Sequence, residues 1–265
     1  MKLIDTHSHL YSRKFEQDHD AVIARAREIN AAVFLPNIDV NSIEALHSLT
    51  DKARDFFFPM MGLHPCDVKE DFLQQLQVME EWLDKGEYAY YGIGETGLDL
   101  YWDKTTLDIQ REALQIQINW AKKRQLPIIL HARNAIDETI EMIEKNHDES
   151  LWGIFHCFDG TADQAKRIVS LGNFKLGIGG IVTYKKSVLP TVLTDVGLPN
   201  LVIETDSPYL PPEPHRGKRN ESSYTQFVAA KLAEIFGVSV AEVARITGEN
   251  AQSVFRTAEI SFAKP

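Results

Sequence analysis

Short apolar runs rich in β-branched and aromatic residues recur along the chain, and longer stretches with helical spacing separate them. Runs that are almost continuously apolar are typical of parallel strands buried on both faces of a sheet. The sequence therefore predicts eight strands, at residues 3–7, 31–36, 56–63, 89–94, 127–131, 152–158, 174–182 and 201–205.

The stretches between these runs contain amphipathic helices. Residues 105–125 carry apolar side chains at positions i, i+4 and i+7 with charged residues on the other face, and residues 224–236 repeat this spacing. Ser239 and Glu242 have the spacing of a capping box, which predicts the start of a final helix that runs toward Phe255.

The alternation of strands and helices indicates an α/β protein with a parallel sheet. Eight such units in about 250 residues favour a closed (β/α)8 barrel of the TIM type, and an open doubly wound sheet is the alternative. The chain has 265 residues and no linker rich in proline, glycine or serine. We therefore expect a single domain over residues 1–265.

The composition narrows the class of protein. With 44% hydrophobic and 25% charged residues, the chain resembles a globular protein with a sizeable core. It has neither a signal-peptide pattern nor a membrane-length apolar run, so we expect a cytoplasmic protein without membrane contact. Cys66 and Cys157 are too few for a disulfide framework and are predicted to be packing residues. A net charge of −10 argues against a broad basic surface that binds nucleic acid, but it does not exclude an enzyme that binds one strand end locally.

Polar side chains gather where the apolar runs stop. In a parallel barrel the carboxyl ends of all strands open onto one face, so such residues converge on one pocket. His19, His47 and His147 fall elsewhere, in helical or loop stretches, and are predicted to lie on the surface. The histidines at strand ends are His7, His9, His64, His131 and His156.

These strand ends carry metal-ligand chemistry. His7 and His9 are two residues apart on one predicted strand, so their side chains point to the same side and can hold one ion together. Imidazole and carboxylate ligands suit a pair of divalent ions, and Glu95 is placed to bridge them. We predict two divalent ions, Mg, Mn or Zn, with the ligands His7, His9, Glu95, His131, His156 and Asp206.

Residues 92–97 match G-x-G-x-x-G, the dinucleotide-binding fingerprint. That fingerprint requires a helix to begin at once, but no helical pattern starts before about Thr105, and Glu95 would face the pyrophosphate. We expect no nucleotide cofactor. The chain also lacks a G-x-S-x-G elbow and a Walker-type loop, so metal-activated water is the predicted nucleophile.

Six motifs resemble, in order and almost end to end, the TatD-like deoxyribonucleases of the amidohydrolase superfamily. They are DTHSHL at 5–10, GLHP at 62–65, GIGETGLD at 92–99, LHAR at 130–133, FHCF at 155–158 and ETDSPYL at 204–210. The resemblance implies a distorted β/α barrel, the same six metal ligands, and metal-dependent hydrolysis of DNA phosphodiester bonds, in several relatives as a 3′-to-5′ exonuclease. The expected partner is DNA, at single-stranded 3′ ends, with no obligate protein partner. The chain departs from many relatives in carrying Asn134 where they have aspartate, which removes a charge near the pocket rim.

The predicted reaction is in-line attack on the phosphodiester by a hydroxide that bridges the two ions. Asp206 is expected to act both as a ligand and as the group that orients or deprotonates this water. His64 is expected to donate a hydrogen bond to a phosphate oxygen or to the leaving group. In the alternative interpretation, its side chain caps a turn before Pro65. Glu204, two residues before Asp206, is predicted to join the catalytic group by supporting a histidine ligand.

Two arginines are predicted to contact substrate phosphate. Arg133 follows the fifth strand, and Arg216 lies in a short basic loop at residues 215–220 after the eighth. The alternatives are a surface salt bridge for Arg133 and a solvated loop for Arg216.

Two other functions remain open from the sequence. A metal hydrolase of the same fold could act on a small amide, lactone or phosphoester, although many such enzymes bridge their metals with a modified lysine on strand four, where this chain has Glu95. The other possibility is a binding or scaffold protein that kept the barrel but lost catalysis. Loss of metal binding in the purified protein would identify it.

Overall fold

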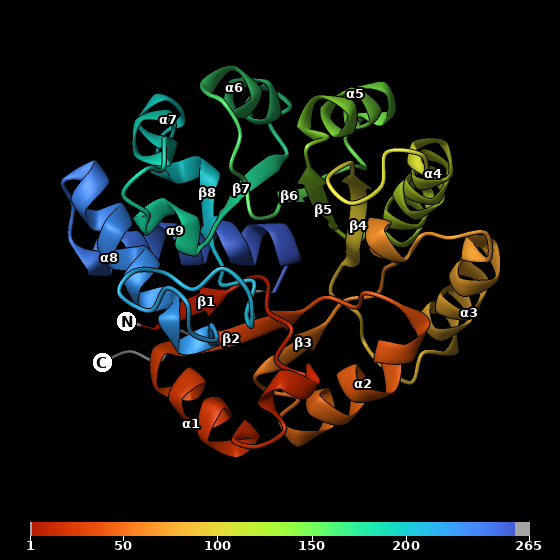
Figure 1. Cartoon of the computed structure of the whole chain (residues 1–265), viewed down its shortest axis with the longest axis horizontal. Helices are drawn as coiled ribbons and strands as arrows, with labels where there is room; N and C mark the ends of the chain where they lie inside the picture. The colour runs from red at the N-terminus through yellow and green to blue at the C-terminus, as the bar shows by residue number, and fades with distance from the viewer. Residues whose placement is uncertain (1, 258–265) are drawn as a thin grey trace.

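The computed structural model describes residues 2–257, and it forms a barrel of parallel strands surrounded by helices (Figure 1). Residues 1 and 258–265, which the predicted domain includes, lie outside the described part. The strands are β1 (Leu3–Asp5), β2 (Asn30–Leu35), β3 (Phe57–Pro59), β4 (Ile93–Asp99), β5 (Ile128–Arg133), β6 (Gly153–Phe155), β7 (Phe174–Ile178) and β8 (Leu201–Ile203).

The strands form two sheets, β1-β2-β3 and β4-β5-β6-β7-β8, with parallel pairing throughout. Backbone hydrogen bonds join the two sheets at both of their edges, where β1 meets β8 and where β3 meets β4. The amide of Thr6 donates to the carbonyl of Ile203 at 3.0 Å, and the amide of Met61 donates to the carbonyl of Gly92 at 3.1 Å. The predicted closed and distorted barrel is therefore confirmed, and the open sheet is wrong.

Helices α1 to α7 follow the strands of the same number and form the outer layer (Figure 1). They are α1 (His19–Ile29), α2 (Ile43–Lys52), α3 (Phe72–Lys85), α4 (Leu107–Arg124), α5 (Ile136–Asn146), α6 (Ala162–Ser170) and α7 (Leu189–Val196), and α8 (Thr225–Phe236) and α9 (Val240–Phe255) follow β8. The three helices predicted from spacing are confirmed as α4, α8 and α9. Within residues 2–257, none of the helices combines the length and apolarity needed to cross a bilayer.

Helix α9 closes the amino end of the barrel. Its Phe255 ring stacks on Phe34 of β2 with centroids 3.6 Å apart, and the indole of Trp152, just before β6, donates to the carbonyl of Val254 at 2.8 Å. These residues belong to a buried cluster that includes inward-facing strand side chains such as Ile129. The carboxyl ends of the strands are left open for chemistry.

The predicted fourth strand is misplaced. It was expected at residues 89–94, but β4 runs over Ile93–Asp99 and pairs with β5 from Ile93 onward. Glu95 and Asp99 thus lie within the strand and are buried at 3% and 2% exposure. A strand built from buried polar residues and glycine has no apolar periodicity, which is why the pattern missed it.

His47 was predicted to lie on the surface and is instead buried in α2 at 6% exposure. Its ring stacks on Tyr88 with centroids 3.8 Å apart, and its Nε2 lies 2.8 Å from the hydroxyl of Tyr90. His19 and His147 are partly exposed. The helical spacing around His47 was correct, but an imidazole can satisfy its polar atoms with tyrosines that come from a distant segment.

Helix α4 fixes two strand ends through buried glutamines. Gln117 is fully buried; its Oε1 accepts from the amide of Leu63 at 2.8 Å and its Nε2 donates to the carbonyl of Leu63 at 3.2 Å. Two turns earlier, Gln110 holds the amide and carbonyl of Asp99 in the same way, at 2.8 and 3.1 Å. The backbone next to His64 and at the end of β4 is therefore held by side chains of one helix.

Replacing Gln117 with leucine is expected to lower the free energy of unfolding by about 3 kcal/mol, because it leaves a buried backbone N–H and C=O without partners. Urea unfolding followed by circular dichroism measures this change. Gln77→Leu, on the exposed face of α3, is the matched control and is expected to stay within about 0.5 kcal/mol of the parent. Equal unfolding midpoints for the two variants would contradict the role of Gln117.

Candidate metal centre

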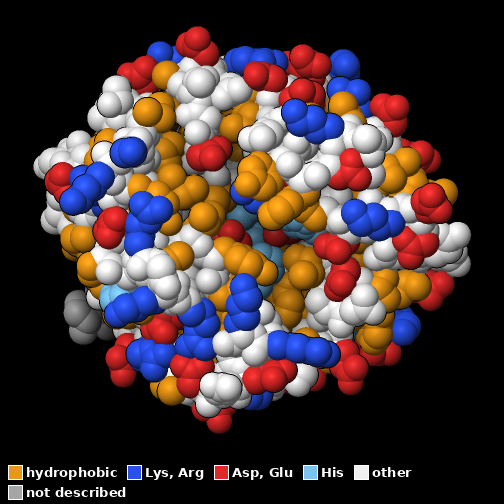
Figure 2. Space-filling model, in the orientation of Figure 1, with side chains coloured by type: hydrophobic (Ala, Val, Ile, Leu, Met, Phe, Trp, Pro, Cys, Tyr) orange, Lys and Arg blue, Asp and Glu red, His pale blue; other side chains and the backbone are white. Residues whose placement is uncertain are grey.

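The carboxyl ends of the strands meet in a hollow at the centre of one face, where histidines lie at the bottom and hydrophobic and acidic side chains surround them (Figure 2). Glu95 is at the middle of this group. Five imidazoles approach its two carboxylate oxygens to within 3.3 Å; they belong to His7, His9, His64, His131 and His156.

The two oxygens of Glu95 face different imidazoles. Oε2 lies 3.1 Å from Nε2 of His7 and 3.3 Å from Nε2 of His9. Asp206 joins this side, since its Oδ1 is 3.4 Å from Nε2 of His9 and 3.8 Å from Nε2 of His7. One carboxylate oxygen, two imidazoles and a second carboxylate therefore surround one point.

Oε1 of Glu95 faces the other side of the hollow. It lies 2.9 Å from Nδ1 of His131, 3.1 Å from Nε2 of His156 and 3.3 Å from Nε2 of His64. Burial alone would raise the pKa of Glu95, but electrostatic attraction to His64, His156 and His7 and the hydrogen bond with His131 hold that pKa well below its usual range. The carboxylate is an anion shared between two groups of imidazoles.

Hydrogen bonds on the outer side of the His9 and His156 rings determine which nitrogen faces Glu95. The hydroxyl of Tyr11 donates to the carbonyl of Pro36 at 2.6 Å, so it accepts from Nδ1–H of His9 at 3.0 Å. Glu204 accepts from Nδ1–H of His156 at 3.1 Å. Both rings therefore turn Nε2 toward the centre, and in the neutral ring this nitrogen carries the lone pair that binds a metal ion.

His131 is held in the opposite orientation by Asp99. Oδ2 of Asp99 accepts from Nε2–H of His131 at 2.9 Å, which leaves Nδ1 facing Glu95. Burial acts to raise the pKa of Asp99, but the hydrogen bond with His131 outweighs it and lowers the pKa far below its ordinary value. Asp99 was not among the predicted site residues, although its place four residues after Glu95 on the same strand could have suggested it.

His64 differs from the other histidines of the cluster. Its Nδ1 accepts from the amide of Cys66 at 3.1 Å, so the proton resides on Nε2, the atom that faces Glu95 and His131 at 3.3 Å. His64 thus caps the turn that contains Pro65, as one prediction had it, and also presents an N–H donor to the hollow. The distances would allow His64 to ligate an ion together with Glu95 and His131. The proton on Nε2 instead makes this nitrogen a hydrogen-bond donor.

The donor set fits divalent ions. Ligand atoms that lie about 2.1 Å from one ion are about 3.0–3.4 Å from each other in octahedral or tetrahedral geometry, and the distances from Glu95 to the facing imidazoles fall between 2.9 and 3.3 Å. The ligand atoms of His7, His156 and Asp206 also lie within 4.8 Å of one another. Buried nitrogen and oxygen donors at this spacing suit Mg, Mn or Zn.

Replacing Asp99 with asparagine is expected to weaken metal binding by about 10- to 100-fold, since an amide N–H facing Nε2 would favour the His131 tautomer whose Nδ1–H points at the centre. Competition with a chromophoric chelator measures the affinity. Asp103→Asn, which removes only a carboxylate bonded to Thr105, is the control and should bind metal like the parent. Equal affinities in the two variants would show that Asp99 does not orient His131.

Glu204 is fully buried behind His156 and outside the hollow. Its Oε1 also accepts from the amide of Cys157 at 2.6 Å. Gly177 makes room for this carboxylate, because a Cβ at that position would lie 2.1 Å from Oε2 of Glu204. The structure thus places the carboxylate of Glu204 against the imidazole of His156, and its support of a metal ligand stays a prediction.

The two predicted substrate arginines lie on the exposed rim. The guanidinium of Arg133 lies 3.7 Å from the ring centroid of Tyr101, and that of Arg216 lies 4.2 Å from the centroid of Tyr184. Within residues 2–257 neither arginine forms an ion pair, so the surface salt bridge considered for Arg133 is wrong. In the same basic loop, Arg219 is bound to Asp18 at 2.6 Å, which leaves less free positive charge than the sequence suggested.

The glycines at residues 92–97 serve strand packing. A Cβ on Gly97 would lie 1.9 Å from the carbonyl oxygen of His131, and Gly97 has a φ of +143° that other residues rarely adopt. No helix follows this segment until Leu107. The arrangement agrees with the prediction that these glycines do not form a dinucleotide loop.

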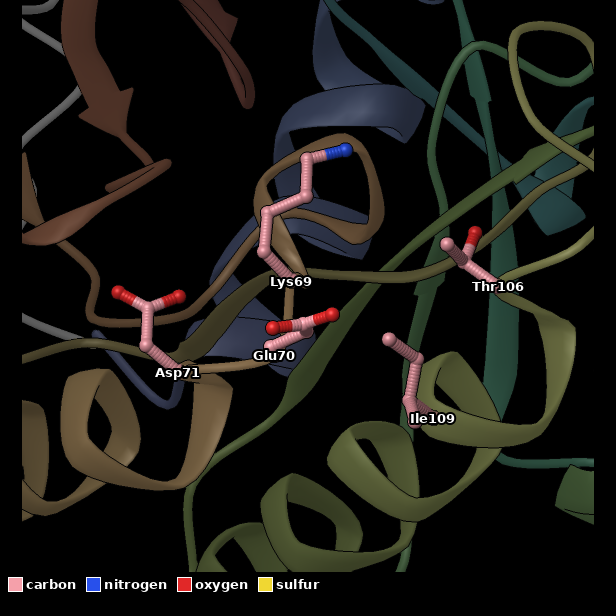
Figure 3. Close-up of a pocket in the computed structure, with 5 residues that line it drawn as sticks. All are labelled: Lys69, Glu70, Asp71, Thr106 and Ile109. Atoms are coloured by element: carbon pink, nitrogen blue, oxygen red, sulfur yellow. The ribbon is translucent and has the colours of Figure 1, made fainter.

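A separate pocket lies outside the centre, between the loop before α3 and the start of α4 (Figure 3). It has a volume of about 570 Å³ and is lined by Lys69, Glu70, Asp71, Thr106 and Ile109. None of these is a predicted site residue. The chemistry of the chain is concentrated in the hollow around Glu95.

Comparison with known proteins agrees with this geometry. Residues 4–256 match the family model described as TatD related DNase. The uncharacterized metal-dependent hydrolase YabD of Bacillus subtilis is 38% identical over 256 residues, with 96% of this chain and 99% of YabD covered. The deoxyribonuclease TATDN3 of Homo sapiens is 28% identical, with 96% and 94% covered. The crystal structure of YJJV, a TatD homolog from Escherichia coli, superposes with a TM-score of 0.89 at 28% identity and covers 96% of this chain and 98% of YJJV. The chain therefore belongs to the TatD-related DNase family of metal-dependent hydrolases.

Proposed function

We propose that the chain hydrolyses phosphodiester bonds at the 3′ ends of single-stranded DNA with the help of two divalent ions. The observation that carries this proposal is the division of Glu95, whose two oxygens face two separate groups of imidazoles. A carboxylate placed in this way suits a bridge between two ions, the arrangement used for in-line displacement at phosphorus. The description of human TATDN3 as a deoxyribonuclease supports DNA as the substrate.

His7, His9 and Asp206 would hold one ion with Oε2 of Glu95, and His131 and His156 would hold the other with Oε1. A divalent pair bound there lowers the pKa of water and neutralises charge on the phosphate. Tyr11, Glu204 and Asp99 keep the imidazoles in the tautomers that this requires. Glu204 is accordingly a positioning residue in this proposal, since its carboxylate accepts hydrogen bonds from the ring of His156 and the amide of Cys157.

Asp206 is proposed as the group that orients the attacking water and accepts its proton. Its side chain is 14% exposed, compared with 3% for Glu95, so it is the cluster carboxylate that solvent reaches. Burial acts to raise the pKa of Asp206, but its contact with His9 and its electrostatic attraction to His156 and His7 lower it below its usual value. The group is therefore an anion at neutral pH and can take a proton.

His64 is proposed to donate Nε2–H to a phosphate oxygen or to the leaving oxygen. The amide of Cys66 holds its other nitrogen, so the ring cannot exchange the donor for a lone pair without losing that bond. Arg133 and Arg216, exposed on the rim, are proposed to contact phosphates of the strand. With a net charge of −10, such contacts are local, and a strand end suits them better than a long duplex.

Cleavage of end-labelled DNA tests the proposal. Chelator-stripped protein is given single metals and single-stranded oligonucleotides labelled at either the 3′ or the 5′ end, next to a Glu95→Ala control. Stepwise shortening of the 5′-labelled strand with immediate release of the 3′ label, absent in the control, is the expected result. Intact DNA with every metal, together with turnover of a small amide, lactone or phosphoester, would replace DNA with the alternative substrate class.

A further inference from the structure

The loop after β4 presents two exposed aromatic side chains beside the metal centre. Trp102 is 72% exposed, more than any other large hydrophobic side chain among residues 2–257, and Tyr101 is 50% exposed. Trp120 and Trp152 are buried, and Trp82 is partly buried. A tryptophan left this open to water, at the rim of the hollow, is available to a flat ligand.

The same carboxylate that orients His131 holds this aromatic pair. Oδ1 of Asp99 accepts from the amide of Tyr101 at 2.8 Å and from the amide of Trp102 at 3.3 Å, while Oδ2 accepts from His131 at 2.9 Å. Asp99 itself is 2% exposed and is held by Gln110 through its backbone. The position of the aromatic pair relative to the metal centre is therefore fixed before any ligand binds.

Arg133 joins the two rings in a cluster of three side chains. Its guanidinium lies 3.7 Å from the ring centroid of Tyr101 and 5.7 Å from that of Trp102. The two rings meet edge to face, with centroids 4.9 Å apart and an interplanar angle of 89°. Arg133 comes from the end of β5, two residues after His131, so the cluster joins the ends of two strands that carry site residues.

A flat, uncharged ring joined to an anionic group matches this surface, since an aromatic face accepts stacking and a guanidinium attracts a phosphate. We propose that Tyr101, Trp102 and Arg133 form a stacking platform for an unpaired base of the DNA strand whose phosphodiester enters the metal centre. This inference rests on the proposed function and adds a specificity to it. The platform selects strands whose bases are free to leave a duplex, because a paired base has no open face.

Binding of oligonucleotides to chelator-treated protein tests the platform, since the strand then stays intact. The probes are a single-stranded decamer of thymidine and a decamer of the same backbone without bases. Trp102→Ala is expected to weaken binding of the thymidine decamer about tenfold and to leave binding of the abasic decamer within about twofold. Thymidine should quench the tryptophan fluorescence of the parent, and the quenching should be lost in the variant.

Two further variants control the result. Trp102→Phe keeps an aromatic face and is expected to bind with intermediate affinity. Val240→Ala removes another exposed apolar side chain, at 47% exposure beside Leu3 at the amino end of the barrel, and is expected to bind like the parent. Equal weakening of the two decamers by Trp102→Ala, or no weakening of either, would overturn the platform.

Metal-dependent cleavage separates failure of the platform from failure of the proposed function. Trp102→Ala is expected to raise KM for the thymidine decamer about tenfold with little change in kcat. If the parent cleaves DNA and Trp102→Ala cleaves it with the same KM, the platform is overturned and the nuclease stands. If the parent cleaves neither decamer with any metal, the proposed function and the platform both fall.

Discussion

Glu95→Gln is expected to reduce metal-dependent hydrolysis at least about 10³-fold, because losing the bridge removes several kcal/mol of charge stabilisation. The carboxylate has an oxygen for each side of the centre, at 2.9 Å from His131 and 3.1 Å from His7. Glutamine offers one oxygen and one NH2 group, and that NH2 group would face imidazole nitrogens that must stay free for an ion. The variant should therefore bind fewer than two ions.

Metal content by elemental analysis and turnover of end-labelled DNA are the two measurements. Glu234→Gln, which changes a carboxylate that is 71% exposed on α8, controls for the loss of one charge and should match the parent in both. A Glu95→Gln protein with two bound ions and parental turnover would exclude the bridging role. Circular dichroism would show whether the barrel is retained.

Asp206→Asn is expected to lower kcat about 10³-fold, within the range for loss of a general base, with a smaller effect on KM. Asparagine keeps the shape of the side chain and an oxygen that can face His9, but it cannot accept a proton from water. Asp206 has a φ of +55°, a left-handed conformation that asparagine tolerates better than most residues. The substitution should therefore leave the backbone between His7 and Ser207 unchanged.

Single-turnover cleavage at saturating metal separates this effect from weaker ion binding. Asp195→Asn, on α7 with 43% exposure, is the control for a lost carboxylate elsewhere and should keep parental kcat. If Asp206→Asn retained parental kcat once saturated with metal, Asp206 would be at most a ligand, and another group would have to take the proton.

Much of the fold could be predicted from the apolar pattern because burial of strands on both faces is recorded locally in the sequence. The error at β4 shows the limit of that signal. Glu95 and Asp99 are buried in a strand, yet their polarity hides the strand. Their carboxylates are satisfied by imidazoles and by the amides of Tyr101 and Trp102 rather than by apolar neighbours. Burial of a polar residue depends on partners that a local pattern does not contain.

The candidate site could also be predicted in its membership, because the carboxyl ends of parallel strands must meet on one face. The structure brings all six predicted ligands together, with His64 beside them. It adds Tyr11 and Asp99, which the strand-end argument left out. Their role is to hold the outer nitrogens of His9 and His131, and that role exists only once Pro36 and the end of β4 are in place.

The sequence by itself determined the type of each long element, the face on which the chemistry lies and the residue types that could hold metal ions, since these follow from periodicity and chain direction. The tertiary structure alone decided which nitrogen of each imidazole faces Glu95 and that His64 presents a proton instead of a lone pair. It also decided that Trp102 lies open beside the centre. These features depend on hydrogen bonds and packing between segments far apart in the chain, and only the closed barrel brings those segments together.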